Sequence, residues 1–133
     1  MKKNTDYIQA NRYLSGKLDI SLKRKLIGII GNIISRIFMG MKIKDYTNGF
    51  RAVKIELYSN IRLIENDFSI IMEEKYKLKK YIKTIGEFST TLSERDKSMR
   101  KTSFNYSLHL VSKYLIYCLL TFTKLNKTIK KIE

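Results

Sequence analysis

Three segments of the chain carry apolar residues at the spacing of an α-helix. The longest stripe runs over residues 22–41, and Gly40 suits the C-terminal end of that helix. A second helix is expected over residues 68–80, where Asp67 or the asparagine before it can supply the N-terminal cap. A last helix is expected over residues 104–124.

Extended segments separate these helices. We expect a strand over residues 6–13 and another over residues 83–92, where isoleucine and threonine favour extended backbone. A short helix is expected at residues 56–61, and a charged loop at residues 93–103. Strands and helices therefore alternate, which indicates an α/β protein. Two or three strands are too few for a complete nucleotide-binding sheet, and no glycine-rich phosphate loop follows any of them.

The composition fits one folded domain, or part of one, with many cations. The chain has 133 residues, of which 44% are hydrophobic, so it can bury a core. Its formal net charge of +15 favours anionic partners: nucleic acid, acidic membranes or phosphorylated substrates. Cys118 is the single cysteine and His109 the single histidine, so we expect a buried thiol rather than a disulfide or a metal site.

The stretch DYTNGFRAVK, at residues 45–54, concentrates polar side chains that can carry chemistry. Asn48 followed by Gly49 is typical of a tight turn that leads into a strand. Such a turn can place Asp45 and Thr47 at the floor of a pocket. In that position Asp45 is expected to bind or to shape the site rather than to act as a base.

The rest of this stretch is expected to hold the turn in place. Phe50 should pack against the protein, and Arg51 should pair with an acid such as Glu73. The residues alone do not indicate an evident enzyme. The sequence has no aspartate pair spaced D-x-D for a metal and no credible Ser-His-Asp set.

Six motifs, in order, resemble the C-terminal half of family-two glycosyltransferases, especially the dolichyl-phosphate mannose synthase-like branch. They are DYIQANRY (6–13), RKLIG (24–28), DYTNGFR (45–51), FSIIME (68–73), GEFS (86–89) and RDKSMRKTS (95–103). DYTNGFR resembles the family's D-x-T-S-G-F-R, and the ordered series is more specific than any one member. The resemblance covers roughly residues 6–104.

The chain departs from the family pattern at several positions. Gly28 stands where the second motif has serine, and Tyr46 stands where the third has proline. Glu87 is kept, but the proline that usually follows in that motif is lost. In the last motif Ser98 and Arg100 replace the usual glycine and serine. The family's D-x-D metal site belongs to its N-terminal half, which has no counterpart among these motifs.

The resemblance implies the C-terminal portion of a GT-A type (nucleotide-diphospho-sugar transferase) fold over residues 1–103. A helix and a basic tail, amphipathic or membrane-associated, follow over residues 104–133. It implies a fragment of an enzyme that moves a sugar from a nucleotide-sugar to polyprenyl (dolichyl-type) phosphate, inactive alone. Mg²⁺ or Mn²⁺ is expected only with the missing N-terminal half, a candidate partner if separately encoded. No cofactor or metal is expected in this chain.

The resemblance also implies an acceptor site rich in cations. Two anions must approach each other in this reaction, so cationic donors must offset their repulsion. Arg12 and Arg24 resemble the family's acceptor-phosphate arginines, and Arg95 resembles a loop arginine that closes over both phosphates. From the residues alone each fits a solvated surface charge as well. The predicted substrate-binding residues are Arg12, Arg24, Asp45, Thr47, Asn48, Gly49, Arg51, Glu73, Arg95 and Lys101.

The last predicted helix has about the length of a membrane span, roughly 20 residues, but His109 and Lys113 interrupt it. We therefore expect it to lie in the interface, with Lys113 along the surface. Three tyrosines are expected at headgroup level: Tyr106, Tyr114 and Tyr117. The basic tail favours anionic lipid. Together with the resemblance, this leads us to expect the chain at the cytoplasmic face of a membrane, peripheral or with this helix inserted.

Two other functions stay open. A small nucleic-acid-binding module would also suit a charge of +15 with nine tyrosines. Aromatic and basic residues do not interleave on one strand face, however, so no nucleic-acid partner is expected. The other alternative is a non-catalytic membrane-associated protein. RNA or DNA retention that falls steeply with salt would support the first alternative. Liposome binding without such retention would support the glycosyltransferase fragment or the membrane-associated protein.

Overall fold

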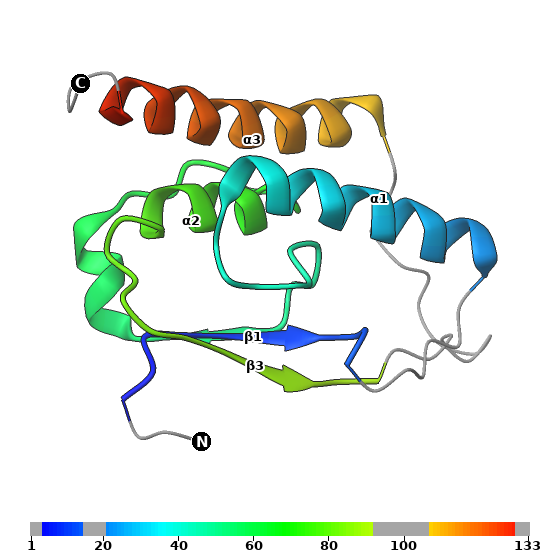
Figure 1. The fold of residues 1–133 in the computed structure, drawn as a ribbon, viewed down its shortest axis with the longest axis horizontal. Helices are drawn as coiled ribbons and strands as arrows, with labels where there is room; N and C mark the ends of the chain where they lie inside the picture. Colours follow the sequence, from blue (N-terminus) through cyan, green and yellow to red (C-terminus); the bar gives the residue numbers. More distant parts are fainter. Residues whose placement is uncertain (1–3, 15–20, 92–106, 130–133) are drawn as a thin grey trace.

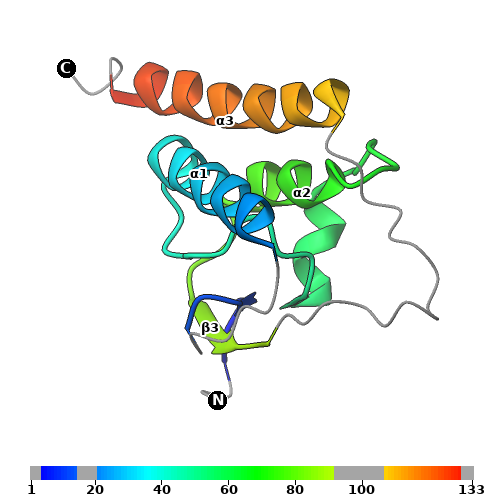
Figure 2. The same ribbon diagram turned by 90° about the vertical axis from the view of Figure 1, so that its right-hand side faces the viewer.

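The sheet and the helices occupy separate layers of the molecule. The computed structural model describes residues 4–14, 21–91 and 107–129, with side chains up to residue 123 in the last segment. In chain order the elements are β1 (Tyr7–Asn11), α1 (Leu22–Met39), β2 (Arg51–Val53), the 3₁₀ helix η1 (Ile55–Asn60), α2 (Ile70–Leu78), β3 (Ile85–Ser89) and α3 (Leu108–Ile129). Figure 1 and Figure 2 show α1 and α2 between the strands and α3.

β1 is the central strand of a mixed sheet in the order β2-β1-β3. It runs antiparallel to β2, where Ile8 lies opposite Ala52, and parallel to β3, where Ile8 lies opposite Gly86. The three α-helices lie on one face of this sheet (Figure 2). The α/β class that the sequence predicted is therefore confirmed, as a small domain with a mixed sheet.

The first helix and the strands end close to their predicted positions. Gly40 terminates α1 with a φ of 61°, the left-handed conformation that glycine adopts readily, as its position predicted. β1 occupies five of the residues expected at 6–13, and β3 occupies five of those expected at 83–92. The short helix expected at residues 56–61 is η1, which begins one residue earlier.

The two later helices start after their predicted positions. Asp67 does not cap a helix at residue 68. Its carboxylate accepts hydrogen bonds from the backbone and the hydroxyl of Ser69, and α2 begins at Ile70. α3 begins at Leu108 and extends past the predicted end at residue 124. The charged loop predicted at 93–103 lies outside the described residues.

The hydrophobic core lies between the three α-helices. It is formed by Met39, Met41, Ile43, Tyr46, Met72, Tyr117 and Cys118. Cys118 is buried, as predicted, and burial raises the pKa of its thiol. The hydroxyl of Tyr46 donates to the carbonyl of Met41 and accepts from the Met41 N–H, both at 2.9 Å. These bonds tie the loop after α1 to the core.

The prediction for the interfacial side of α3 is wrong at three of its residues. Lys113 points toward the segment ahead of α2, where its Nζ lies 2.5 Å from a carboxylate oxygen of Glu65 and the side chain stays partly exposed. Tyr117 is buried and donates to Glu65, and the Tyr114 hydroxyl donates to a backbone carbonyl ahead of α2. Tyr106 lies outside the described residues. The polar side of α3 thus packs against the segment ahead of α2, where the carboxylate of Glu65 pairs with the Lys113 amine.

Apolar side chains of α1 and α3 face solvent instead. On α1 the exposed residues are Leu22, Leu26, Ile30, Ile33 and Ile37, each 49–71% exposed. On α3 they include Val111, Leu115, Leu119 and Phe122, each 42–52% exposed. The buried face of α1 carries Asn32 and Ser35 beside Met39. Within the described residues no helix is both long enough and apolar enough to cross a membrane.

Candidate functional site

The loop after α1 brings the DYTNGFR segment back against β1. The turn in this loop lies at Tyr46 and Thr47, so the predicted turn at Asn48 and Gly49 is wrong. Gly40 is the one described glycine with a positive φ, so Gly49 does not adopt the conformation that an Asn-Gly hairpin turn requires. The segment still leads into a strand, β2, as predicted.

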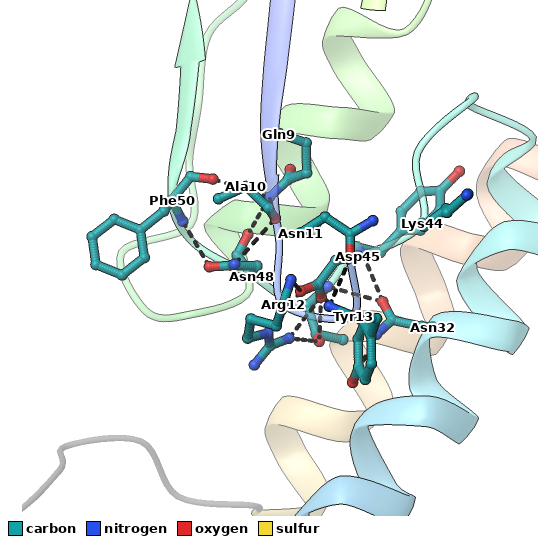
Figure 3. A network of polar contacts seen from close by, with 12 residues as sticks. Gln9, Ala10, Asn11, Arg12, Tyr13, Asn32, Lys44, Asp45, Asn48 and Phe50 are labelled. Carbon is teal, nitrogen blue, oxygen red and sulfur yellow. Dashed lines mark hydrogen bonds and ion pairs between the residues drawn. The ribbon is translucent and has the colours of Figure 1, made fainter. Parts of the chain in front are cut away.

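Asn48 is buried, and its side chain joins two strands. Its Nδ2 donates to the carbonyl of Ala10 at 3.1 Å, and its Oδ1 accepts from the N–H of Phe50 at 3.1 Å (Figure 3). The amide therefore takes the place of ladder hydrogen bonds where the loop enters β2. The prediction that Phe50 packs against the protein is wrong. Its side chain points away from this network and is 74% exposed.

Arg12 and Asp45 form the centre of the site (Figure 3). Arg12 follows β1 directly, and its Nε and Nη2 donate to the two carboxylate oxygens of Asp45, both at 2.7 Å. The backbone N–H of Arg12 also donates to Asp45, at 3.1 Å. Nη2 reaches the hydroxyl of Thr47 as well, at 2.6 Å. Asp45 is fully buried, whereas 17% of the Arg12 side chain is exposed, so the pair sits just below the surface.

Asn32 holds this loop from the middle of α1. Its Oδ1 accepts from the backbone N–H of Tyr46 at 2.6 Å and from that of Thr47 at 3.3 Å. Its Nδ2 lies 3.4 Å from both Asp45 and the hydroxyl of Tyr13. Sequence reasoning missed Asn32. An amide within an otherwise apolar stretch of helix was the available signal, because such a group is buried only where it finds partners.

Gln9 is a second buried amide that sequence reasoning missed. Its Nε2 donates to the carbonyls of Asn48 and Phe50, at 3.0 and 3.1 Å, and its Oε1 accepts from the hydroxyl of Tyr7. Burial is the first cause that raises the pKa of that hydroxyl, well above its ordinary range. Gln9 thus fixes the path of the chain between Asn48 and β2.

The absence of a side chain at Gly28 lets the first half of α1 pack closely against Tyr13, the residue after Arg12. A Cβ atom on Gly28 would lie 2.8 Å from the hydroxyl of Tyr13, closer than real Cβ contacts allow. Arg24 precedes Gly28 by one helical turn, and Asn32 follows it by one. These three therefore lie along one side of α1, the side that faces the Arg12–Asp45 pair.

Arg51 pairs with Glu74, so the expected partner Glu73 is wrong. Nε of Arg51 donates to Glu74 at 2.5 Å, and Nη2 donates to the second carboxylate oxygen. The hydroxyl of Tyr58 adds a third hydrogen bond to Glu74, at 2.8 Å. The hydrogen bond to Glu74 is the largest cause that raises the pKa of Arg51. Arg51 thereby joins the start of β2 to α2.

Glu73 instead organises the segment ahead of α2. Its carboxylate accepts the backbone N–H groups of Ile64 and Glu65, at 2.9–3.1 Å, and pairs with Lys77 at 2.6 Å. The two adjacent glutamates, turned about 100° from each other on α2, thus bind different neighbours: Glu73 binds the segment ahead of α2 and Glu74 binds Arg51 and Tyr58. Because Glu73 is buried and fully engaged, its observed contacts are structural.

Two further charged residues, Glu87 on β3 and Lys75 on α2, lie around this site. Glu87, the acid kept in the GEFS motif, accepts from Nδ2 of Asn11 at 3.1 Å and from the backbone N–H of Lys44 at 2.6 Å. Lys75 on α2 is completely buried, and its amine lies 3.4 Å from the carbonyl of Ile71. Burial, followed by the charge of Arg51, lowers the pKa of Lys75 to about 7.

The structure therefore brings some of the predicted site residues together. Arg12, Asp45, Thr47 and Asn48 share one network at the end of β1 (Figure 3). Arg51 and Glu73 lie in separate contacts around α2. Arg95 and Lys101 fall outside the described residues. Within those residues no three His, Cys, Asp or Glu side chains gather where a metal ion could bind.

Comparison with known proteins adds no relative to this picture. Neither a protein-family model nor a curated protein sequence matches the chain. The functional argument therefore rests on the motifs and on the geometry of the described residues.

Proposed function

We propose that this chain is the acceptor-side half of a family-two glycosyltransferase, with the C-terminal portion of a GT-A type fold. The complete enzyme would move a sugar from a nucleotide-sugar to a polyprenyl phosphate. The ion pair between Arg12 and Asp45 carries the proposal, because it joins the first and the third matched motifs across 33 positions of sequence. Thr47, from the third motif, binds the same guanidinium.

The two arginines would serve the acceptor site in different ways. Both carboxylate oxygens of Asp45 hold Arg12, so its role would be to shape the site at the end of β1. Among the described residues no carboxylate forms an ion pair with Arg24. Arg24 lies on the same side of α1 as Gly28 and Asn32. A guanidinium binds phosphate through two parallel hydrogen bonds. Arg24 would therefore bind the acceptor phosphate.

The remaining parts of the reaction would come from the half of the family's fold that precedes these motifs. That N-terminal half, carried by the same polypeptide or encoded separately, would bind the nucleotide-sugar and the Mg²⁺ or Mn²⁺ ion. An anionic phosphate nucleophile needs little help from a base, and the buried Asp45 is already committed to Arg12. No catalytic residue is therefore assigned in this chain, and the chain alone would be inactive.

The exposed faces of α1 and α3 support a position on the cytoplasmic face of a membrane. These helices lie side by side (Figure 1), and the rings of Phe38 and Phe122 meet edge to face at 5.5 Å. Their outward side chains together form an apolar surface, which we call the α1/α3 face; it comprises Leu22, Leu26, Ile30, Ile33, Ile37, Val111, Leu115, Leu119 and Phe122. Large exposed apolar patches mark interaction sites. The net charge of +15 would favour anionic lipid.

Binding of a short polyprenyl phosphate tests the acceptor site. Farnesyl phosphate in detergent micelles would be titrated into the purified chain, with farnesol as the ligand control. A hydrogen bond to a charged group contributes about 1.5–3 kcal/mol. Arg24→Ala should therefore weaken binding about tenfold or more. Arg36→Ala is the matched control, because Arg36 lies on the same helix, is exposed and belongs to no matched motif. Equal binding by both variants would place the acceptor site elsewhere.

Sugar transfer tests the half-enzyme proposal separately. The purified chain, with Mg²⁺ or Mn²⁺ present, should transfer no radiolabelled sugar from a nucleotide-sugar to the lipid phase. Turnover by these 133 residues alone would refute the proposal that the donor site lies outside them.

A further inference from the structure

The face of the sheet that points away from the α-helices is apolar on all three strands. Neighbouring residues in register share a face, and successive residues along a strand alternate between faces. In the observed register Ile8 shares a face with Ala52 and Gly86. This surface, which we call the open sheet face, consists of Ile8, Ala10, Ala52, Gly86 and Phe88, with Phe50 beside Ala10 just ahead of β2. Thr5 lies against Gly86, and the ion pair between Asp6 and Lys54 borders the apolar residues at one end.

Its two aromatic residues reach into solvent. Phe50 is 74% exposed and Phe88 is 43% exposed, and Figure 3 shows Phe50 pointing away from the buried network. β1 and β3 are parallel strands, and parallel strands occur almost only in sheets whose two faces are both covered. The α-helices cover one face of this sheet (Figure 2). Among the described residues no helix covers the other face; Ala10, at its centre, is buried, whereas Phe50 and Phe88 on either side of Ala10 are exposed.

β3 is also an edge strand without the usual protection. Among the described residues it pairs with β1 alone. Its sequence, Ile85–Ser89, contains neither lysine nor proline, the residues that commonly block an edge. Its charged residue, Glu87, is bound on the helix side by Asn11 and by the backbone of Lys44. The outer backbone groups of β3 therefore offer a template for another strand.

The apolar face and the strand edge together define the kind of partner. A lipid surface would cover Phe50 and Phe88 but has no groups that pair with a strand in register. A polypeptide can satisfy both requirements by adding a strand. The net charge of +15 favours an acidic polypeptide, whereas a second copy of the chain would bring another +15 and repel.

We propose that β3 and the open sheet face bind an acidic polypeptide, which adds a strand to β3 and covers Phe50 and Phe88 with apolar side chains. The proposal rests on the sheet alone and holds whichever reaction the chain serves.

Strand addition can be tested with a designed peptide and the full chain. A short, capped, fluorescent peptide in which valine and glutamate alternate would be titrated and its anisotropy measured. Saturable binding is expected. The same peptide with alternate amides N-methylated keeps its charge and side chains but cannot pair as a strand, so it should bind at least about tenfold more weakly. A version with lysine in place of glutamate should also bind more weakly.

Variants of the chain locate the binding surface. Phe88→Asp should weaken binding of the unmethylated peptide about tenfold or more, because it places charge on the open sheet face. Ile30→Asp is the matched control: it introduces the same charge at a comparably exposed position on α1 and should leave binding unchanged. Circular dichroism would verify folding, and Phe50→Asp replaces Phe88→Asp if the latter unfolds.

Several results would overturn the proposal. They are the absence of saturable binding, equal binding of the methylated and unmethylated peptides, and equal loss of binding in Phe88→Asp and Ile30→Asp. A dimer in sedimentation that Phe88→Asp dissociates would also overturn it, since the open sheet face would then bind a second copy.

Discussion

The guanidinium of Arg12 and the carboxylate of Asp45 form a bidentate ion pair between segments that lie 33 positions apart in the sequence. Asp45 is fully buried, so it has no access to water that could replace its partner. The pair therefore fixes the loop after α1 to the end of β1. A buried charge that loses its partner is costly, which makes this pair the first target for mutation.

Asp45→Asn should lower the free energy of unfolding markedly. The asparagine keeps the shape of the side chain but leaves Arg12 without its counter-charge. Breaking a buried pair costs about 3–5 kcal/mol, and partial exposure of Arg12 argues for about 3 kcal/mol. Urea unfolding measures the change. Lys54→Ala is the control, because it removes a more exposed pair, with Asp6, of a kind that contributes about 0–1 kcal/mol. If both variants lose the same amount, the Arg12–Asp45 pair does not hold the loop.

Gly28→Ala should destabilise the protein, against the usual trend for a helix. Replacing a glycine inside a helix by alanine ordinarily stabilises by about 1 kcal/mol. At Gly28 the new Cβ would lie 2.8 Å from the hydroxyl of Tyr13, so a net loss of about 1–2 kcal/mol is expected. Gly31→Ala is the control, since its Cβ would meet Thr47 at an ordinary 3.6 Å and should stabilise.

Removal of the Tyr13 hydroxyl should rescue the first of these variants. The double variant Gly28→Ala, Tyr13→Phe should be more stable than Gly28→Ala in thermal unfolding. If Gly28→Ala stabilises the protein as much as Gly31→Ala does, then Tyr13 moves aside without cost.

The sequence predicted where the elements lie better than which side of them is buried. Apolar spacing located α1, and Gly40 marked its end. Spacing identifies an apolar stripe, however, and contains no information on what covers it. In α1 the stripe through Ile30 and Ile37 faces solvent, and the amide of Asn32 faces inward because the loop around Asp45 supplies its partners.

Four predicted site residues, Arg12, Asp45, Thr47 and Asn48, lie together, whereas the buried amides of Gln9 and Asn32 were not predicted. Arg12, Asp45 and Thr47 were predicted as site residues from the motifs, but the ion pair between Arg12 and Asp45 was not predicted; it forms because the buried carboxylate needs a cationic partner. Gln9 and Asn32 pair with backbone groups, and backbone partners are not visible in a sequence. The partner of Arg51 was misassigned because Glu73 and Glu74 are adjacent, and one helical residue turns a side chain by about 100°.

The α1/α3 face should bind anionic vesicles. The chain should float with vesicles that contain phosphatidylserine, and less with neutral ones. Ile30→Asp with Leu119→Asp should reduce flotation strongly, because each places a charge in the apolar surface. Phe50→Asp with Phe88→Asp is the matched control: it also adds two charges at exposed apolar positions, but on the open sheet face, and should float like the original chain. Equal loss of flotation in the α1/α3 variant and in its control would rule out the α1/α3 face as the lipid contact. Deletion of residues 104–133 should also abolish flotation.

Lys75 should make the stability of the protein depend on pH in the alkaline range. Burial, and then the charge of Arg51, lowers the pKa of Lys75 from 10.5 to about 7 in the folded protein. Between these two values the unfolded chain binds a proton that the folded protein does not. The free energy of unfolding must therefore rise with pH in this range, by up to about 1.4 kcal/mol per pH unit. Below pH 7 both states are protonated, and the cost of the buried charge is fully present.

Lys75→Met removes this dependence while filling nearly the same volume. The variant should be more stable than the original chain at pH 6, by an amount that shrinks steadily as the pH is raised toward 9. Urea unfolding at several pH values gives the difference, in which the other titrating groups cancel because both proteins contain them. A difference that stays constant from pH 6 to 9 would mean that Lys75 remains protonated inside the fold. Its charge would then have to be balanced by Glu74 and Asp45, the two acids that oppose the shift.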